Sequence, residues 1–283
     1  MSEARVAEAR PSVPAAAQRA ARRRRLVVTL QIAVLALVLG SWELCARTGI
    51  VDPFFFGKPS GIVQQIREWI IEGTSLGPLW VQILVTLEET LLGFGIGALL
   101  GIVFGVALGR NRLLADVFDV YVKIANSIPR VVLGSIFVVA LGLGMASKVA
   151  LGVVMVFFVV FGNAFQGVRE ADRNLIANAR ILGASPRQVT TAVVIPSALS
   201  WIIASLHVSF GFALVGAVVG EFLGSRQGIG LLIATAQGTF NAAGVFAAMI
   251  VLAVVALIAE SLITLLENTL IKWRPAQLAE TGF

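Results

Sequence analysis

Asn163 and His207 stand alone inside long apolar runs of this sequence, and Glu221 stands at the end of one. Such groups are costly in an apolar setting and commonly mark a solute path or a gate. His207 is the single histidine and Cys45 the single cysteine, so we expect neither a metal site nor a catalytic set. For His207 we favour a hydrogen-bonded position within a helix bundle over a position facing the path. For Glu221 we favour a structural or gating role over substrate binding.

The most organised polar feature is the segment "ANARILGASPRQVTTAVVIP" at residues 177–196. Asp172 can cap a helix with an apolar face of Leu175, Ile176, Ala179 and Leu182. Gly183 is placed to end this helix in a left-handed conformation. Ser185 and Gln188 have the spacing of a capping box, with Pro186 at the first helical position. Pro196 suits the first turn of the next helix. We expect two short helices separated by Gly183 and Ala184.

The composition is that of a polytopic membrane protein. Of 283 residues, 58% are hydrophobic and 13% charged, against about 25% charged in soluble domains. The mean hydropathy is +0.91. The net charge of +6 is better explained by the positive-inside rule than by nucleic-acid binding. We therefore expect an all-α membrane protein that contacts lipid and does not bind nucleic acid.

Six apolar stretches are long enough to span a bilayer, which takes about 20 residues. The third is short, and we expect it to begin near Val117 with a kink or break at Pro129. The six stretches are Leu26–Ala46, Ile83–Leu108, Arg130–Leu143, Lys148–Val168, Ser197–Gly220 and Val245–Leu266.

The distribution of basic residues predicts the orientation. With an internal N-terminus, 17 of the 22 Lys and Arg residues fall inside. Both termini and residues 172–196 are then expected in the cytoplasm. The five that fall outside are Arg47, Lys58, Arg67, Lys148 and Arg226.

The resulting organisation is a single bundle with flanking segments. We expect a disordered basic tail at 1–25, a first transmembrane helix at 26–46, and an external segment at 47–82. A transmembrane core follows at 83–266, containing the polar loop (residues 172–196), and then a cytoplasmic tail at 267–283.

Two patterns concern helix faces. In the external segment, Ile62, Ile66, Trp69 and Ile70 share one face, which predicts an amphipathic helix on the membrane surface; a partner docking surface is the alternative. In the second span, glycines recur every four residues from Gly93 to Gly109, which favours close helix packing over a role in lining a path.

The polar loop resembles the EAA loop of binding-protein-dependent ABC importer permeases. That pattern is Glu-Ala-Ala, three residues, Gly, nine residues, then Ile-x-Leu-Pro. Here Ala177, Asn178 and Ala179 precede Gly183, and Val193 to Pro196 close the pattern with both spacings kept. Ala177 stands in the place of the family's glutamate. "IPRVVLGSIFVVALGLG" and "GEFLGSRQGIGLLI" are similar to the nitrate, sulfonate and taurine branch.

This resemblance implies a MetI-like permease with six helices in the bacterial inner membrane. It implies a pair of permeases, two cytoplasmic ATPase subunits that carry ATP and Mg²⁺, and an external solute-binding protein. The chain itself contains no G-x-x-x-x-G-K-[ST] phosphate loop. Alternating access would import a small solute, such as a sulfonate, taurine or nitrate. The implied coupling residues are Ala177, Asn178, Ala179, Arg180, Gly183, Ala184, Ser185, Val193 and Pro196.

Two other functions are compatible with an apolar chain of this length. A self-contained secondary transporter or channel would commonly place charges or broken helices near the membrane midplane. The predicted spans carry few charges. An intramembrane enzyme would need a nucleophile and base or a carboxylate pair, which the spans do not present.

Overall fold

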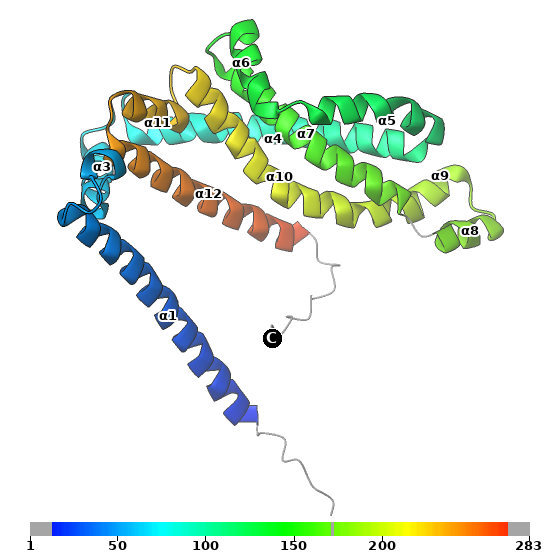
Figure 1. Ribbon diagram of the computed structural model, residues 1–283. Coiled ribbons are helices and arrows are strands. Elements are labelled where there is room, and N and C mark those ends of the chain that lie inside the picture. Colours follow the sequence, from blue (N-terminus) through cyan, green and yellow to red (C-terminus); the bar gives the residue numbers. More distant parts are fainter. Residues whose placement is uncertain (1–12, 171–172, 271–283) are drawn as a thin grey trace, which may run out of the picture.

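The computed structural model describes residues 13–170 and 173–270, and Figure 1 shows their arrangement. Three long helices form the body: α4 (Leu79–Arg110), α7 (Met145–Arg169) and α10 (Ile195–Leu223). Helix α7 packs extensively against both α4 and α10. Another long helix, α12 (Ala242–Leu270), packs on the short helix α11 (Ile229–Gly238) at one end of the body and runs from there toward its middle.

Five helical stretches of the described chain are long and apolar enough to cross a membrane. The sixth expected span is a broken pair, α5 (Arg112–Ser127) and α6 (Arg130–Leu141), bent by 84°. The prediction of a break at Pro129 is confirmed. Ile128 is extended at ψ 127°, as expected for a residue before proline, whose ring disfavours a helical neighbour.

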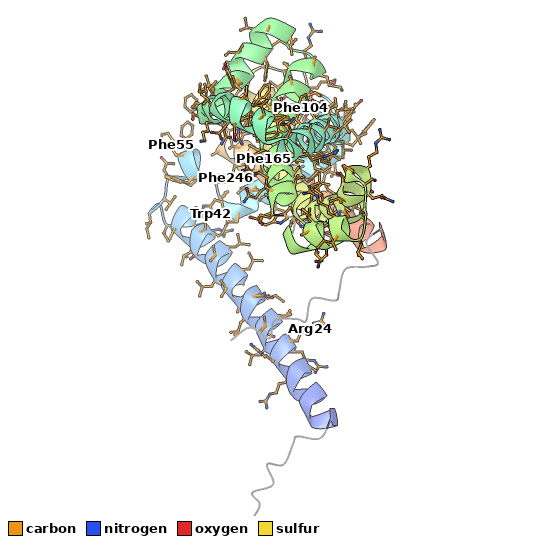
Figure 2. All side chains as sticks on the ribbon, turned by 90° about the vertical axis from the view of Figure 1, so that its right-hand side faces the viewer. Arg24, Trp42, Phe55, Phe104, Phe165 and Phe246 are labelled. Carbon is orange, nitrogen blue, oxygen red and sulfur yellow. The ribbon has the colours of Figure 1, made fainter. Side chains whose placement is uncertain are left out.

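Helix α1 (Val13–Arg47) begins earlier than expected. The predicted disordered tail is wrong for residues 13–25, which are helical because alanine and arginine are good helix formers. Residues 1–12 of that tail and residues 271–283 of the C-terminal tail lie outside the described residues. Figure 2 shows α1 projecting away from the bundle, with Trp42 near its attached end. There Trp42 packs edge-on against Phe246, with ring centroids 5.3 Å apart.

The segment after α1 contains α2 (Pro53–Phe56) and α3 (Pro59–Ile71). The amphipathic helix is confirmed, but its expected seat on the membrane surface is wrong for most of its apolar face. Ile62 and Trp69 are buried in a core with residues of α11 and α12, whereas Ile70 is exposed. The chain's own C-terminal helices therefore cover that face.

The glycine row of α4 lies against α7, as the preference for close packing predicted. A Cβ placed on Gly101 would stand 2.8 Å from the Cβ of Val160, and one on Gly105 would stand 2.7 Å from the Cβ of Ala164. Contacts this short leave no room for a methyl group. The small residues bring the two backbones together and do not line a path at these positions.

Candidate functional site

The polar loop lies at the end of the bundle opposite α3 and α11 (Figure 1). Its first helix, α8, covers Arg173–Ile181. Gly183 follows with φ +83°, a left-handed conformation that favours glycine. The amide of Gly183 donates to the Arg180 carbonyl and that of Ala184 to the Ala179 carbonyl, both at 3.0 Å. This pair of bonds is a Schellman motif, and it fixes the turn that sequence predicted.

The second part of the loop is held by a capping box. The Ser185 hydroxyl accepts from the Gln188 amide at 3.3 Å, and the Gln188 side chain accepts from the Ser185 amide at 2.8 Å. Pro186 occupies the first turn of α9 (Pro186–Val189). The capping box and the proline that sequence predicted at the start of this helix are therefore both present.

The expected separation at Gly183 and Ala184 is present, but the second helix is not short. A π-helical turn, η1 (Thr190–Val194), joins α9 to α10. Together they form one helical run of 38 residues, Pro186–Leu223. Proline lacks an amide hydrogen, and a wider turn before Pro196 lets the helix continue past it. The polar loop is thus continuous with a spanning helix.

Large apolar side chains of α8 and of the turn that follows it are uncovered, beside the exposed polar side chains of Asn178 and Arg180. Ile181 is 82% exposed, Leu182 is 86% exposed, and Leu175 is also exposed. Ile176 and Ala179 of the predicted apolar face are half-buried, where α8 packs on α9 and η1. A nine-residue helix is marginal in water on its own. Its exposed apolar side chains at a fixed turn form a surface suited to a protein partner.

The three predicted path residues have different neighbours. The Asn163 side chain donates to the Val159 carbonyl of its own helix at 2.9 Å. The Nε2 of His207 lies 3.5 Å from an oxygen of Glu260 on α12. Glu221 is fully buried at the far end of α10. They do not form one site, and His207 has the kind of bundle contact that was preferred for it.

Glu221 belongs to a buried polar cluster, which agrees with a structural or gating role. Its Oε1 accepts from the Thr86 hydroxyl at 2.7 Å, and its Oε2 from the Gly230 amide at 2.6 Å. Glu89 of α4 and Lys148 of α7 are buried beside it. The Lys148 ammonium donates to the carbonyls of Leu143 at 2.7 Å and Gly144 at 3.1 Å.

Sequence reasoning missed most of this cluster. Gln82, Thr86 and Lys148 are fully buried, yet hydropathy placed them at or beyond the ends of spans. Glu89, which lies inside the predicted span Ile83–Leu108, was not singled out as a site residue and is 2% exposed. The available signal was the "GIG" sequence at Gly228–Gly230, where backbone can approach closely.

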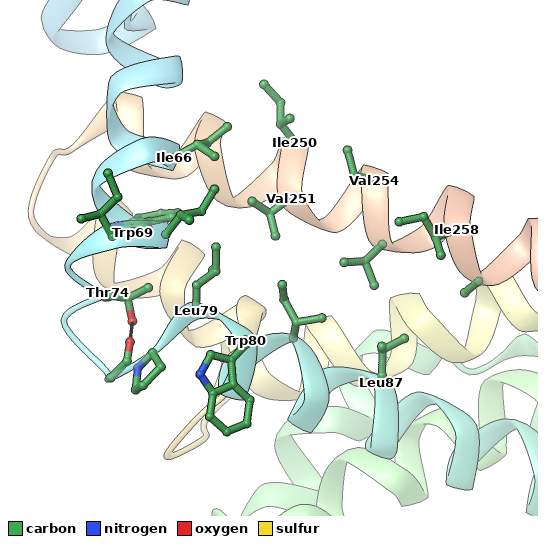
Figure 3. A pocket seen from close by; sticks show the side chains of 18 of the residues that line it. Ile66, Trp69, Thr74, Leu79, Trp80, Leu87, Ile250, Val251, Val254 and Ile258 are labelled. Carbon is green, nitrogen blue, oxygen red and sulfur yellow. Dashed lines mark hydrogen bonds between the residues drawn. The ribbon is translucent and has the colours of Figure 1, made fainter.

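An apolar cavity of about 1100 Å³ opens between α3, α4 and α12 (Figure 3). Trp69, Leu79 and Trp80 line one side and Val251, Val254 and Ile258 the other. None of Asn163, His207 and Glu221 lines it. A wall of this composition suits lipid tails or another apolar helix better than a charged solute.

Comparisons with known proteins agree with this architecture. Residues 97–272 match the family described as "Binding-protein-dependent transport system inner membrane component". A permease protein of Bacillus subtilis (strain 168) assigned to aliphatic sulfonate transport, SsuC, is 31% identical, with 84% of this chain and 85% of the relative covered. The taurine transport system permease protein TauC of Escherichia coli (strain K12) is 29% identical, over 87% of this chain and 90% of the relative.

A solved structure has the same fold. The inward-facing MetNI methionine ABC transporter aligns with a TM-score of 0.58 at 20% identity, covering 69% of this chain and 94% of that chain. The match of 97–272 spans the polar loop and all three long helices of the body except the first half of α4. The chain belongs to the family of binding-protein-dependent transport system inner membrane components and is a MetI-like ABC importer permease, whose partners supply ATP hydrolysis and solute capture.

Proposed function

We propose that the polar loop is the surface through which a partner ATPase drives this permease. The observation that carries the proposal is the exposed apolar side of α8, fixed by the Gly183 turn at the start of the 38-residue run to Leu223. A groove on the ATPase would cover Ile181 and Leu182. Ala177, Asn178, Ala179, Arg180, Ala184, Ser185, Val193 and Pro196 complete the proposed coupling set.

In this proposal the loop and both termini face the cytoplasm. The distribution of lysine and arginine favours that orientation, with 17 of 22 on the inner side. The α3–α11 end then faces outward, where a solute-binding protein would dock. ATP and Mg²⁺ belong to the two ATPase subunits, and this chain binds neither.

The translocation path is proposed to form between two copies of the chain. The cavity between α3, α4 and α12 is apolar, and the glycine row that could have lined a path packs against α7. A polar solute therefore has no evident route through the described part of a single chain. A homodimer would enclose one path between its two copies, with Asn163, His207 and Glu221 as candidates for the lining or the gate of that path.

The substrate we propose is a small sulfonate. Two relatives that cover most of this chain are named for aliphatic sulfonate and taurine transport. The external binding protein would select the anion. ATP binding would draw the two polar loops together and open the pair outward, and hydrolysis would reset it.

Reconstitution tests the proposal. The permease, its ATPase and its binding protein are placed in liposomes with ATP inside, and uptake of labelled taurine and of an alkanesulfonate is measured. We expect uptake only with all three components and ATP. Uptake by the permease alone would support a self-contained transporter and would contradict the proposal that a partner ATPase drives this permease.

A further inference from the structure

Helix α11 begins without a capping side chain of its own. Its N-cap is Gly228, at φ +111°. Helices usually satisfy their first amides with a nearby Ser, Thr, Asp or Asn. Here three amides point at side chains of other helices. Gly228 donates to Gln82 Oε1 at 2.8 Å, Ile229 to Thr86 Oγ1 at 2.9 Å, and Gly230 to Glu221 Oε2 at 2.6 Å.

These three acceptors, which we call the polar cap (Gln82, Thr86 and Glu221), are fully buried and fixed in turn. The Thr86 hydroxyl donates to Glu221 Oε1 at 2.7 Å, and the Gln82 amide group donates to the Leu76 carbonyl at 3.0 Å. Each acceptor therefore has one orientation. The carboxylate also faces the positive end of the α11 dipole, which favours a negative group there.

The close approach depends on glycine. A Cβ on Gly228 would stand 2.2 Å from the Glu221 carboxyl carbon, and one on Gly230 would stand 2.3 Å from the Val218 carbonyl oxygen. Any side chain at either position would push α11 off the polar cap. The "GIG" sequence and the three acceptors therefore form one arrangement.

The polar cap is connected to the polar loop at the other end of the molecule by one helical run. Glu221 lies in the last turn of α10, at the end of the run that begins at Pro186 in the polar loop. At about 1.5 Å per residue such a run is roughly 57 Å long. Helix α11 in turn packs through Ile229 and Leu232 into the core that holds α3 and α12.

We propose that Gln82, Thr86 and Glu221 are positioning residues that fasten α11 to α4 and α10, so that movement of the polar loop reaches the α3–α12 core. The proposal rests on the transport function stated above. In this proposal, α11 connects α4 and α10 to the α3–α12 core at the outer end of the molecule. Loosening the polar cap would leave ATP hydrolysis in place and reduce the solute moved per ATP.

The test replaces Thr86 by Val, which keeps the side chain's shape and removes its hydroxyl. Thr86→Ser restores the hydroxyl. Thr90→Val is the matched control, because Thr90 lies one turn along α4, is fully buried, and donates to the Thr86 carbonyl within the same helix. Hydrogen exchange of the amides at 228–230 and taurine uptake per ATP are measured for all three variants in lipid.

We expect Thr86→Val to speed exchange at 228–230 roughly fivefold or more, the size expected for one lost buried hydrogen bond. Uptake per ATP should fall severalfold. Thr86→Ser and Thr90→Val should keep both values near those of the parent. Unchanged exchange in Thr86→Val would contradict the claim that the polar cap fastens α11. Faster exchange with unchanged uptake per ATP would contradict its role in transport.

Two further measurements keep the outcomes apart. If Thr86→Val does not fold, Gln82→Met removes both the acceptor of the Gly228 amide and the donor to the Leu76 carbonyl, and the same two readouts apply. If the parent protein takes up no sulfonate, the proposed substrate fails, whereas the exchange measurement still decides the polar cap.

Discussion

The hydroxyl of Thr86 lies 2.7 Å from the carboxylate of Glu221, joining α4 to the end of α10 across 135 residues of chain. Both side chains are fully buried. The bond therefore connects two spanning helices where no water competes for it, and it leaves the second carboxylate oxygen to accept from Gly230.

Replacing Glu221 by Gln should destabilise the protein. The carboxylate accepts two hydrogen bonds, but an amide places an N–H₂ group opposite one of the two donors. A buried unsatisfied group costs about 1–3 kcal/mol. We expect the melting temperature in detergent to fall by about 2–4 °C per kcal/mol. Glu88→Gln is the control, since Glu88 is an exposed glutamate of α4, the helix that supplies Thr86. Equal melting temperatures for the two variants would contradict the buried role of Glu221.

The glycine row predicts a graded response along one helix. Gly105→Ala should destabilise, because its Cβ would stand 2.7 Å from the Ala164 Cβ, and overpacking costs about 1–3 kcal/mol. Gly95→Ala on the opposite side meets nothing within 4 Å and should be neutral or stabilising, by up to about 1 kcal/mol. Thermal unfolding of the two variants checks this. A Gly105→Ala protein as stable as Gly95→Ala would show that α4 and α7 are not in close contact.

The Gly183 turn predicts a defect in coupling without loss of the fold. Alanine at φ +83° costs about 1–2 kcal/mol, which exceeds what a nine-residue helix can absorb, so α8 should fray. Gly183→Asn should be milder, since asparagine tolerates this conformation. ATPase stimulation by the binding protein should follow the order Gly, Asn, Ala, with melting of the bundle unchanged. Gly183→Ala at full stimulation would refute a coupling role for the turn.

The features that the sequence predicted correctly depend on residues close to one another in the chain. Gly183 and Ser185 act on neighbours within a few residues, so their spacing was sufficient to predict the turn and the capping box. The four-residue glycine repeat likewise identified a packing face. Pro129 predicted the break between α5 and α6 through its effect on Ile128.

The missed features depend on contacts between distant segments. Helix α11 is ten residues long and takes its cap from Gln82 and Thr86, more than 140 residues earlier in the chain. Hydropathy gave no sign that Glu89 is buried, because it does not detect contacts among helices. The apolar face of α3 was assigned to lipid because sequence does not show that α11 and α12 cover it.

The central claim is that the exposed apolar side chains at the end of α8 and in the turn after it bind the ATPase, and Leu182→Asp tests this most directly. Leu182 is 86% exposed, so the charge should leave the permease stable while it disrupts an apolar contact. Ile50→Asp is the control, being 77% exposed in the turn after α1 at the other end of the bundle. The measurement is co-purification of the ATPase with each variant from membranes. We predict that Leu182→Asp loses most of the bound ATPase, about tenfold or more, and Ile50→Asp none. Full ATPase recovery with Leu182→Asp would contradict the account.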